Sequence, residues 1–146
     1  MRPVPSPLLL LVLALVADES LLAQDVVRGR LLQFNDNGAW SWFEDERAIV
    51  DPGSGRILVG SCADSSGVGG APRSGDIDIA WLDLGAGRFG QFELRDRLED
   101  DDHNAPALLL RPDGRYLAMY NTHGSSPLSW WRISSPGDPT SWTVEA

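Results

Sequence analysis

The feature that most constrains the fold is a set of short β-like runs, separated by turn residues, that occurs twice along the chain. The runs cover residues 47–50, 56–61, 76–83 and 88–94 in the first set, and 105–110, 115–120, 128–133 and 141–144 in the second. No convincing helical period accompanies them. Many short strands punctuated by Gly, Pro and Asp are typical of all-β sandwiches, barrels and propellers.

The two sets resemble each other in sequence, which indicates an internal repeat. Residues 48–50 and 56–59 correspond to 107–109 and 115–118, and residues 79–82 correspond to 128–131. An offset of about 50 to 60 residues is long but acceptable for propeller blades that carry loop insertions. The pattern therefore predicts a β-propeller of four-stranded antiparallel blades.

The length of the chain limits how much of such a propeller it can contain. A propeller needs about four to eight blades to close, and 146 residues provide about two. We therefore expect residues 24–146 to be the N-terminal part of an incomplete propeller, and expect this piece to be inactive by itself. Self-association of short chains is the alternative.

The first 23 residues have the pattern of a signal peptide. Arg2 precedes an apolar run from Leu8 to Ala17, which is too short to span a bilayer, and a small residue follows at Ala23. We expect residues 1–23 to direct export, so that the mature protein is secreted or periplasmic. A retained N-terminal anchor is the alternative.

The charge composition limits the class of partner. The net charge is −9, with 21 acidic residues and 12 basic residues, all of them arginine. This acidity argues against nucleic acid, which requires a basic face, although a local cluster can still bind a polyanion. Cys62 is the only cysteine, so no intrachain disulfide is expected, and a small buried residue is the simplest interpretation.

The only two histidines lie at the two ends of one predicted hairpin. Residues 105–110 form an apolar strand, Pro112-Asp113-Gly114 forms a turn, and residues 115–120 return. The hairpin brings its outer ends together, so His103 and His123 should be neighbours, each able to titrate near neutral pH.

Several interpretations of this pair remain open at this stage. Both histidines could bond backbone groups in turns, or they could bind a metal with Asp101 or Asp102, although no third ligand is defined by spacing. The acidic run 99–102 lacks the alternating spacing of a calcium loop and is expected to be a solvated connection.

Three stretches give the chain a resemblance to a known family. They are residues 36–51 (DNGAWSWFEDERAIVD), residues 75–84 (GDIDIAWLDL), and Asp101-Asp102-His103-Asn104-Ala105-Pro106-Ala107 with residues 111–116 (RPDGRY) and the later His123-Gly124. Residues 135–142 (SPGDPTSW) look like a degenerate Asp-box turn. Together they resemble the BNR-repeat-containing propellers, and among these the ulvan lyases, which cleave a sulfated algal polysaccharide. Ser41 departs from the pattern, because many relatives are expected to have Cys there.

The resemblance implies a function and a set of site residues. Such lyases cleave acidic, uronate-containing polysaccharide by β-elimination. By this resemblance, His103 is the proton-transfer residue, His123 is a second catalytic residue that contacts the substrate carboxylate, and Asn104 is a substrate-binding residue. A tyrosine and an arginine would come from later blades. The chemistry requires no cofactor, and a structural metal ion is left undecided. The expected partner is an acidic polysaccharide, with no nucleic acid and no membrane after signal cleavage.

Two other functions remain as alternatives. One is a carbohydrate-binding propeller without catalysis, and the other is a glycoside hydrolase of sialidase type. A sialidase requires a tyrosine nucleophile with a glutamate partner, and Tyr116 and Tyr120 lack that context. The six tryptophans could stack on sugars, but packing within blades is the default interpretation.

Overall fold

The computed structural model describes residues 32–33, 35–39, 41 and 47–146. The signal segment, Trp40 and Trp42 therefore lie outside the described residues. Contacts divide the chain at Leu32, and the unit from Gln33 onward is described here by itself. Within the described residues, no helix is long and apolar enough to cross a bilayer.

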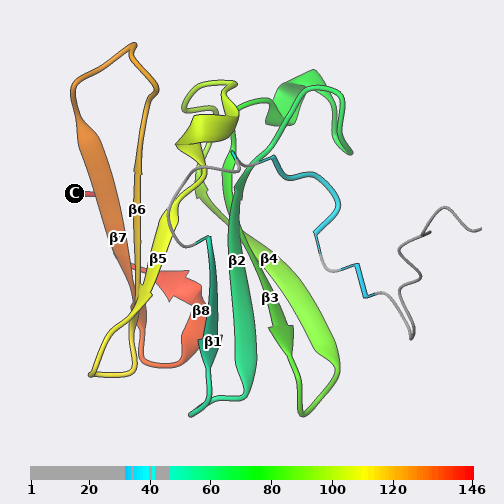
Figure 1. Cartoon of the computed structure of the whole chain (residues 1–146), viewed down its shortest axis with the longest axis vertical. Coiled ribbons are helices and arrows are strands. Elements are labelled where there is room, and N and C mark those ends of the chain that lie inside the picture. The colour runs from blue at the N-terminus through cyan, green and yellow to red at the C-terminus, as the bar shows by residue number, and fades with distance from the viewer. Residues whose placement is uncertain (1–31, 34, 40, 42–46) are drawn as a thin grey trace, which may run out of the picture. The chain divides into compact units, whose positions relative to one another are not determined.

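The described chain is all-β and forms two four-stranded antiparallel sheets (Figure 1). The first sheet has the order β1 (Ala48–Asp51), β2 (Arg56–Cys62), β3 (Ile77–Asp83) and β4 (Arg88–Arg95). The second has the order β5 (Ala107–Leu110), β6 (Tyr116–Asn121), β7 (Ser129–Ser135) and β8 (Asp138–Trp142). Two short 3-10 turns, η1 (Ala71–Arg73) and η2 (Asp102–Asn104), precede β3 and β5. The all-β prediction is confirmed.

The two copies of the predicted repeat lie in equivalent strands of the two sheets. Residues 48–50 and 56–59 lie in the β1–β2 hairpin, and residues 107–109 and 115–118 lie in or beside the β5–β6 hairpin. Residues 79–82 lie in β3 and residues 128–131 reach into β7, so both correspond to the third strand of a sheet. The last strand begins at Asp138 rather than at Ser141, because the turn after β7 is tight and the predicted Asp-box segment supplies most of β8.

The two sheets meet through apolar side chains and a few polar ties. Strand β1 lies beside β5, and β4 lies beside β8. Tyr116 of β6 is fully buried, and its hydroxyl donates to Oδ2 of Asp51 on β1 at 2.7 Å. The buried core consists of Leu58, Cys62, Ile77, Ile79, Leu94, Leu108, Tyr116, Ala118 and Tyr120.

One close approach between backbones lies where the sheets meet. A Cβ atom added at Gly60 of β2 would lie 2.6 Å from Cγ of Pro106 and 2.8 Å from its carbonyl oxygen. Only glycine leaves room for the chain that enters β5. This approach sets the position of η2, the turn just before Pro106, against the end of β2.

Candidate functional site

The site is built at the open end of the β5–β6 hairpin. His103 lies in η2, which is joined to β5 by Ala105 and Pro106, and His123 follows the end of β6 at Asn121. The antiparallel register, in which Ala107 faces Met119, brings the two flanking segments together. The imidazole centroids are 4.1 Å apart with an interplanar angle of 26°, so the rings are stacked. The predicted proximity of the two histidines is confirmed.

Asp101 binds both histidines. Its Oδ1 accepts the backbone N–H of His103 at 2.9 Å, so Asp101 is the N-cap of η2. The same carboxylate lies 2.7 Å from Nδ1 of His103, through Oδ1, and 2.9 Å from Nδ1 of His123, through Oδ2. An ionised carboxylate only accepts hydrogen bonds. Each Nδ1 therefore carries its hydrogen, and a neutral ring keeps its lone pair on Nε2.

The electrostatics of Asp101 fit this role as a shared acceptor. Partial burial alone would raise the pKa of Asp101, but hydrogen bonds from the His103 backbone and from both imidazoles more than offset it. The pKa is lowered to about 2. Asp101 is therefore an anion near neutral pH.

Glu99 contacts the backbone of His123, and Asn104 in turn contacts Glu99. Oε2 of Glu99 accepts the backbone N–H of His123 at 2.7 Å, and this bond, with others, lowers the pKa of Glu99. Asn104 is fully buried and donates through Nδ2 to the Glu99 carbonyl at 3.1 Å and to Oε2 at 3.2 Å. Asn104 therefore holds Glu99 and does not line the cleft. Its substrate-binding role stays a prediction.

Both histidines line an open cleft of about 480 Å³. His103 has 27% of its side chain exposed and His123 has 56%, so both are accessible to a ligand. Among the described residues that line the cleft, none is Lys or Arg, and four are Asp. The lining residues are Ala39, Cys62, Ala63, Asp64, Asp100, Asp101, Asp102, His103 and His123.

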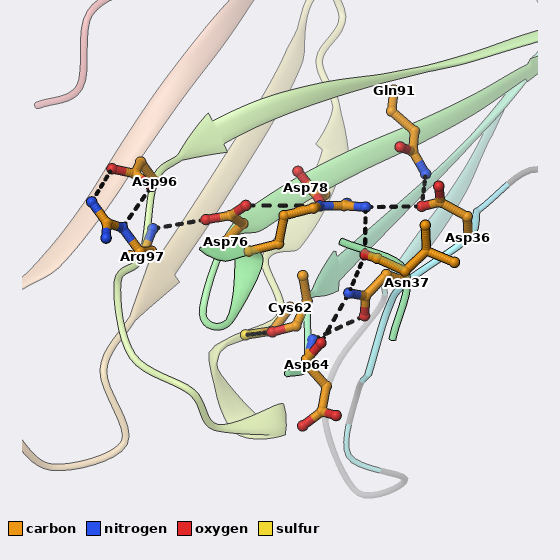
Figure 2. A network of polar contacts seen from close by, with 12 residues as sticks. Asp36, Asn37, Cys62, Asp64, Asp76, Asp78, Gln91, Asp96 and Arg97 are labelled. Carbon is orange, nitrogen blue, oxygen red and sulfur yellow. Dashed lines mark hydrogen bonds and ion pairs between the residues drawn. The ribbon is translucent and has the colours of Figure 1, made fainter. Parts of the chain in front are cut away.

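A Gly/Ser-rich loop, residues 63–75, continues one wall of the cleft from Asp64. Asn37 holds this loop, because its Nδ2 donates to the carbonyls of Asp64 and Val68 while its Oδ1 accepts the Asp64 N–H (Figure 2). Arg73 anchors the other end through Asp36 at 3.1 Å and Asp78 at 2.7 Å. The loop is thus tied to the sheet by specific bonds rather than only by its ends.

Cys62 is a buried residue beside the cleft, as predicted. Its side chain is almost inaccessible, and its Sγ contacts the Glu99 carbonyl at 3.6 Å. Burial, with minor effects of nearby carboxylates, raises the pKa of the thiol to about 11. The thiol stays protonated near neutral pH, so it is not suited to nucleophilic chemistry.

The sequence indicates the role of the acidic run 99–102 only in part, because it offers Asp101 or Asp102 as possible metal ligands and gives no sign that Glu99 contacts a histidine. The run was expected to be a solvated connection, yet Glu99 and Asp101 both accept hydrogen bonds from His123 or His103. The signal that could have found Asp101 is its position two residues before His103, at which an Asp caps a short turn. Asp101, His103 and His123 also each offer one metal-ligand atom within 4.8 Å of the others.

The tryptophans within the described residues mostly pack inside the fold. Trp81, Trp130 and Trp142 pack against the core, and Trp130 lies under the guanidinium of Arg95 at 4.8 Å. Trp131 is 40% exposed, on the opposite face of its sheet. The expectation that tryptophans pack within the fold is therefore confirmed for three of the four described tryptophans.

Comparison with known proteins gives structural neighbours only. No protein family matches the sequence, and no curated protein does. The fold is similar to a solved structure described as a new family of polysaccharide lyase, an ulvan lyase, with a TM-score of 0.55, 21% identity, and coverage of 75% of this chain and 28% of that chain. It is also similar to an ulvan lyase bound to -[GlcA(1-4)Rha3S]-, with a TM-score of 0.54, 20% identity and the same coverages.

These neighbours are far longer than the chain. The chain covers 28% of the length of each of these lyases. At 20 to 21% identity the likeness concerns the fold. The two sheets therefore have a fold similar to part of a polysaccharide lyase.

Proposed function

We propose that this chain is part of a secreted polysaccharide lyase that cleaves an acidic, uronate-containing polysaccharide by β-elimination. The observation that carries the proposal is the stacked pair His103 and His123, oriented by Asp101, at an open cleft. The similarity of the fold to part of an ulvan lyase supports it, because one such neighbour is described with a GlcA-containing glycan.

In the proposed reaction, His103 is the base. Nε2 of neutral His103 accepts the C5 proton of the uronate, the C5–H electron pair forms the C4=C5 double bond, and the C4–O bond breaks. The leaving glycosidic oxygen takes up a proton from an acid group that the proposal assigns to the protein beyond these two sheets. His103 then releases its proton to solvent, so the protons balance and no water is consumed. Asp101 keeps Nδ1–H of His103 in place, which leaves Nε2 as the acceptor, and imidazole suits this role near neutral pH.

His123 is the proposed contact for the substrate carboxylate. Removal of the C5 proton requires that the negative charge of the uronate be neutralised, and a protonated His123 can donate from Nε2 while Asp101 holds its Nδ1. The cleft otherwise carries Asp side chains, which would repel a uronate. The proposal therefore assigns further cationic groups to parts of the protein beyond these two sheets.

The proposed complete architecture is a β-propeller in which these sheets are two blades. One face of the second sheet supports this, because it carries exposed Leu109, Met119 and Trp131. A shallow apolar hollow of about 340 Å³ lies on it, lined by Arg111, Leu117, Met119, Trp131 and Ile133. An apolar sheet face of this kind is suited to packing against another sheet.

The alternative of a sialidase-type hydrolase is not favoured by the positions of the tyrosines. Tyr116 and Tyr120 are both buried, and their hydroxyls donate to Asp51 and Glu145. Burial, and then the bond to Glu145, raise the pKa of Tyr120 well above its ordinary value. Neither phenol lines the histidine cleft.

The product distinguishes the three candidate functions. The protein encoded by the complete gene should be incubated with several uronate-containing polysaccharides, and both ultraviolet absorbance and reducing ends should be followed. The proposal predicts new reducing ends that each come with one unsaturated, ultraviolet-absorbing uronate. Reducing ends without that chromophore would indicate a hydrolase, and retention on the polysaccharide without either signal would indicate a binding protein. Either result would overturn the proposal.

A further inference from the structure

We propose that Asp101, His103 and His123 form a binding site for one transition-metal ion of the Zn²⁺ type, and that a bound ion switches the site off as a base. The metal site stands on the geometry of the three residues. The switching effect rests on the proposed function, because it concerns the proton that His103 would accept.

The first argument is the convergence of the ligand atoms. One potential ligand atom from each residue lies within 4.8 Å of the other two. Nδ1 of both histidines already faces the same carboxylate, at 2.7 Å and 2.9 Å. Zn²⁺ binds imidazole nitrogen at about 2.0–2.1 Å and carboxylate oxygen at about 2.0–2.2 Å, so small movements would place an ion among all three atoms.

The second argument is the charge and access of the cleft. Asp100 and Asp102 line the same cleft as the three ligands, and within the described lining no Lys or Arg competes for their carboxylates. Asp102 Oδ1 is 3.0 Å from Nδ1 of His103, close enough to become a fourth ligand. The exposed side of His123 leaves room for a water instead.

A second cluster of acidic side chains, near β3, shows why the two histidines are needed for a metal site. Asp36 and Asp78 also gather there (Figure 2), but Arg73 binds both and thus fills the position of a cation. At the histidine cleft the same kind of negative charge surrounds two imidazoles, which are preferred ligands of Zn²⁺ and can bind it when neutral.

The consequence for catalysis follows from the two nitrogens of imidazole. A neutral ring carries one hydrogen, and a metal on Nδ1 requires that nitrogen to offer its lone pair. The hydrogen of His103 then lies on Nε2, which becomes a donor. A donor cannot accept the C5 proton, so metal occupancy and the base role exclude each other.

Direct metal binding tests the site without any assay of activity. Untagged full-length protein is freed of metal with a chelator, and Zn²⁺ is titrated at neutral pH against a chromophoric chelator. Co²⁺ replaces Zn²⁺ in a second titration, in which the visible spectrum reports nitrogen ligation. We expect one ion per chain, with affinity about 10-fold or more weaker in His103→Ala, His123→Ala and Asp101→Asn. Asp113→Asn, on the exposed turn of the β5–β6 hairpin, makes the same change in charge and should leave the affinity unchanged.

Two results would overturn the metal site. One is the absence of stoichiometric binding in protein whose thermal unfolding shows it to be folded. The other is equal affinity in the unmodified chain and in His123→Ala, whose largely exposed side chain makes loss of folding an inadequate explanation.

The switching effect is tested separately with the elimination assay. One equivalent of Zn²⁺ should lower the rate about 10-fold or more, and excess chelator should restore it. Stoichiometric binding with an unchanged or increased rate would overturn the switch while the metal site stands. Absence of elimination under all conditions would overturn the proposed function, and the binding titration would still decide the metal site.

Discussion

The imidazole rings of His103 and His123 stack with their centroids 4.1 Å apart, and both Nδ1 atoms face the carboxylate of Asp101. One anion between two rings balances one positive charge, and two cationic rings at this distance would repel each other. The arrangement is therefore suited to one neutral ring and one cationic ring. These are the two forms that the proposed roles require, with His103 as the proton acceptor and His123 as the carboxylate contact.

In the proposed reaction Asp101 positions the two imidazoles, so its replacement should lower the elimination rate without removing either histidine. In Asp101→Asn one carbonyl oxygen remains and can accept from only one Nδ1–H with the original geometry. We expect the rate to fall about 10- to 100-fold, as for groups that orient a metal-binding imidazole through its other nitrogen. Measurement of kcat and KM against uronate-containing polysaccharide checks this, with Asp113→Asn as the control for charge. An unchanged rate would show that the carboxylate does not orient the pair.

Tyr116→Phe should destabilise the contact between the two sheets. The hydroxyl donates to Asp51 at 2.7 Å and is fully buried, so its loss leaves a buried carboxylate with one partner fewer. We expect a loss of about 1–3 kcal/mol in the free energy of unfolding, measured by urea denaturation. A double-mutant cycle with Asp51→Asn isolates the pair. Simple addition of the two single effects would contradict a direct interaction.

Asp51 should also make stability depend on acid pH. Burial alone would raise its pKa, but hydrogen bonds from Ser54, Tyr116 and the backbone N–H groups of Ser54 and Gly53 more than offset it, so the pKa is lowered. A lowered folded pKa gives stability that is present above the ordinary value of 3.8 and is lost as pH falls through the folded value. Thermal unfolding across this range should show a shallower loss for Asp51→Asn than for the unmodified chain. Parallel curves would contradict the assignment.

Gly60→Ala tests the close approach of the two sheets. The added Cβ would lie 2.6 Å from Cγ of Pro106 and 2.8 Å from its carbonyl oxygen, so backbone must move. We expect a loss of about 1–3 kcal/mol, as is typical of overpacking. Gly85→Ala is the matched control, because its Cβ meets only Asp83 Oδ1 at 3.6 Å and should change stability little. Equal effects of the two substitutions would show that the sheets can separate at this point.

Local sequence patterns were enough to predict most of the strands. The turns at 51–55 and 112–114 carry Pro, Asp and Gly, whose backbone preferences close hairpins, so β1–β2 and β5–β6 were predicted closely. The same hairpin logic placed His103 beside His123. The start of strand β8 is predicted three residues too late, because residues 135–142 look like an Asp-box turn in the sequence, whereas the chain from Asp138 already pairs with β7.

The rest of the site depends on contacts that no local pattern contains. Glu99 and Asp101 belong to a run of acidic residues that is equally consistent with a solvated connection, and only the fold brings His123 onto both. The family resemblance predicts that Asn104 binds substrate beside His103, but one residue of a 3-10 turn is enough to direct its side chain into the interior.

The most direct test of the account is the rate of elimination by the full-length protein and by its His103→Ala variant. The ultraviolet absorbance of the unsaturated uronate should be followed with a polysaccharide that contains uronate, and Asp113→Asn should serve as a control. We expect a steady rise for the unmodified protein and the control, and a rate lower by about 100-fold or more for His103→Ala. An equal rise in all three proteins would contradict the role of His103. No rise from folded protein that still binds the polysaccharide would contradict the lyase itself.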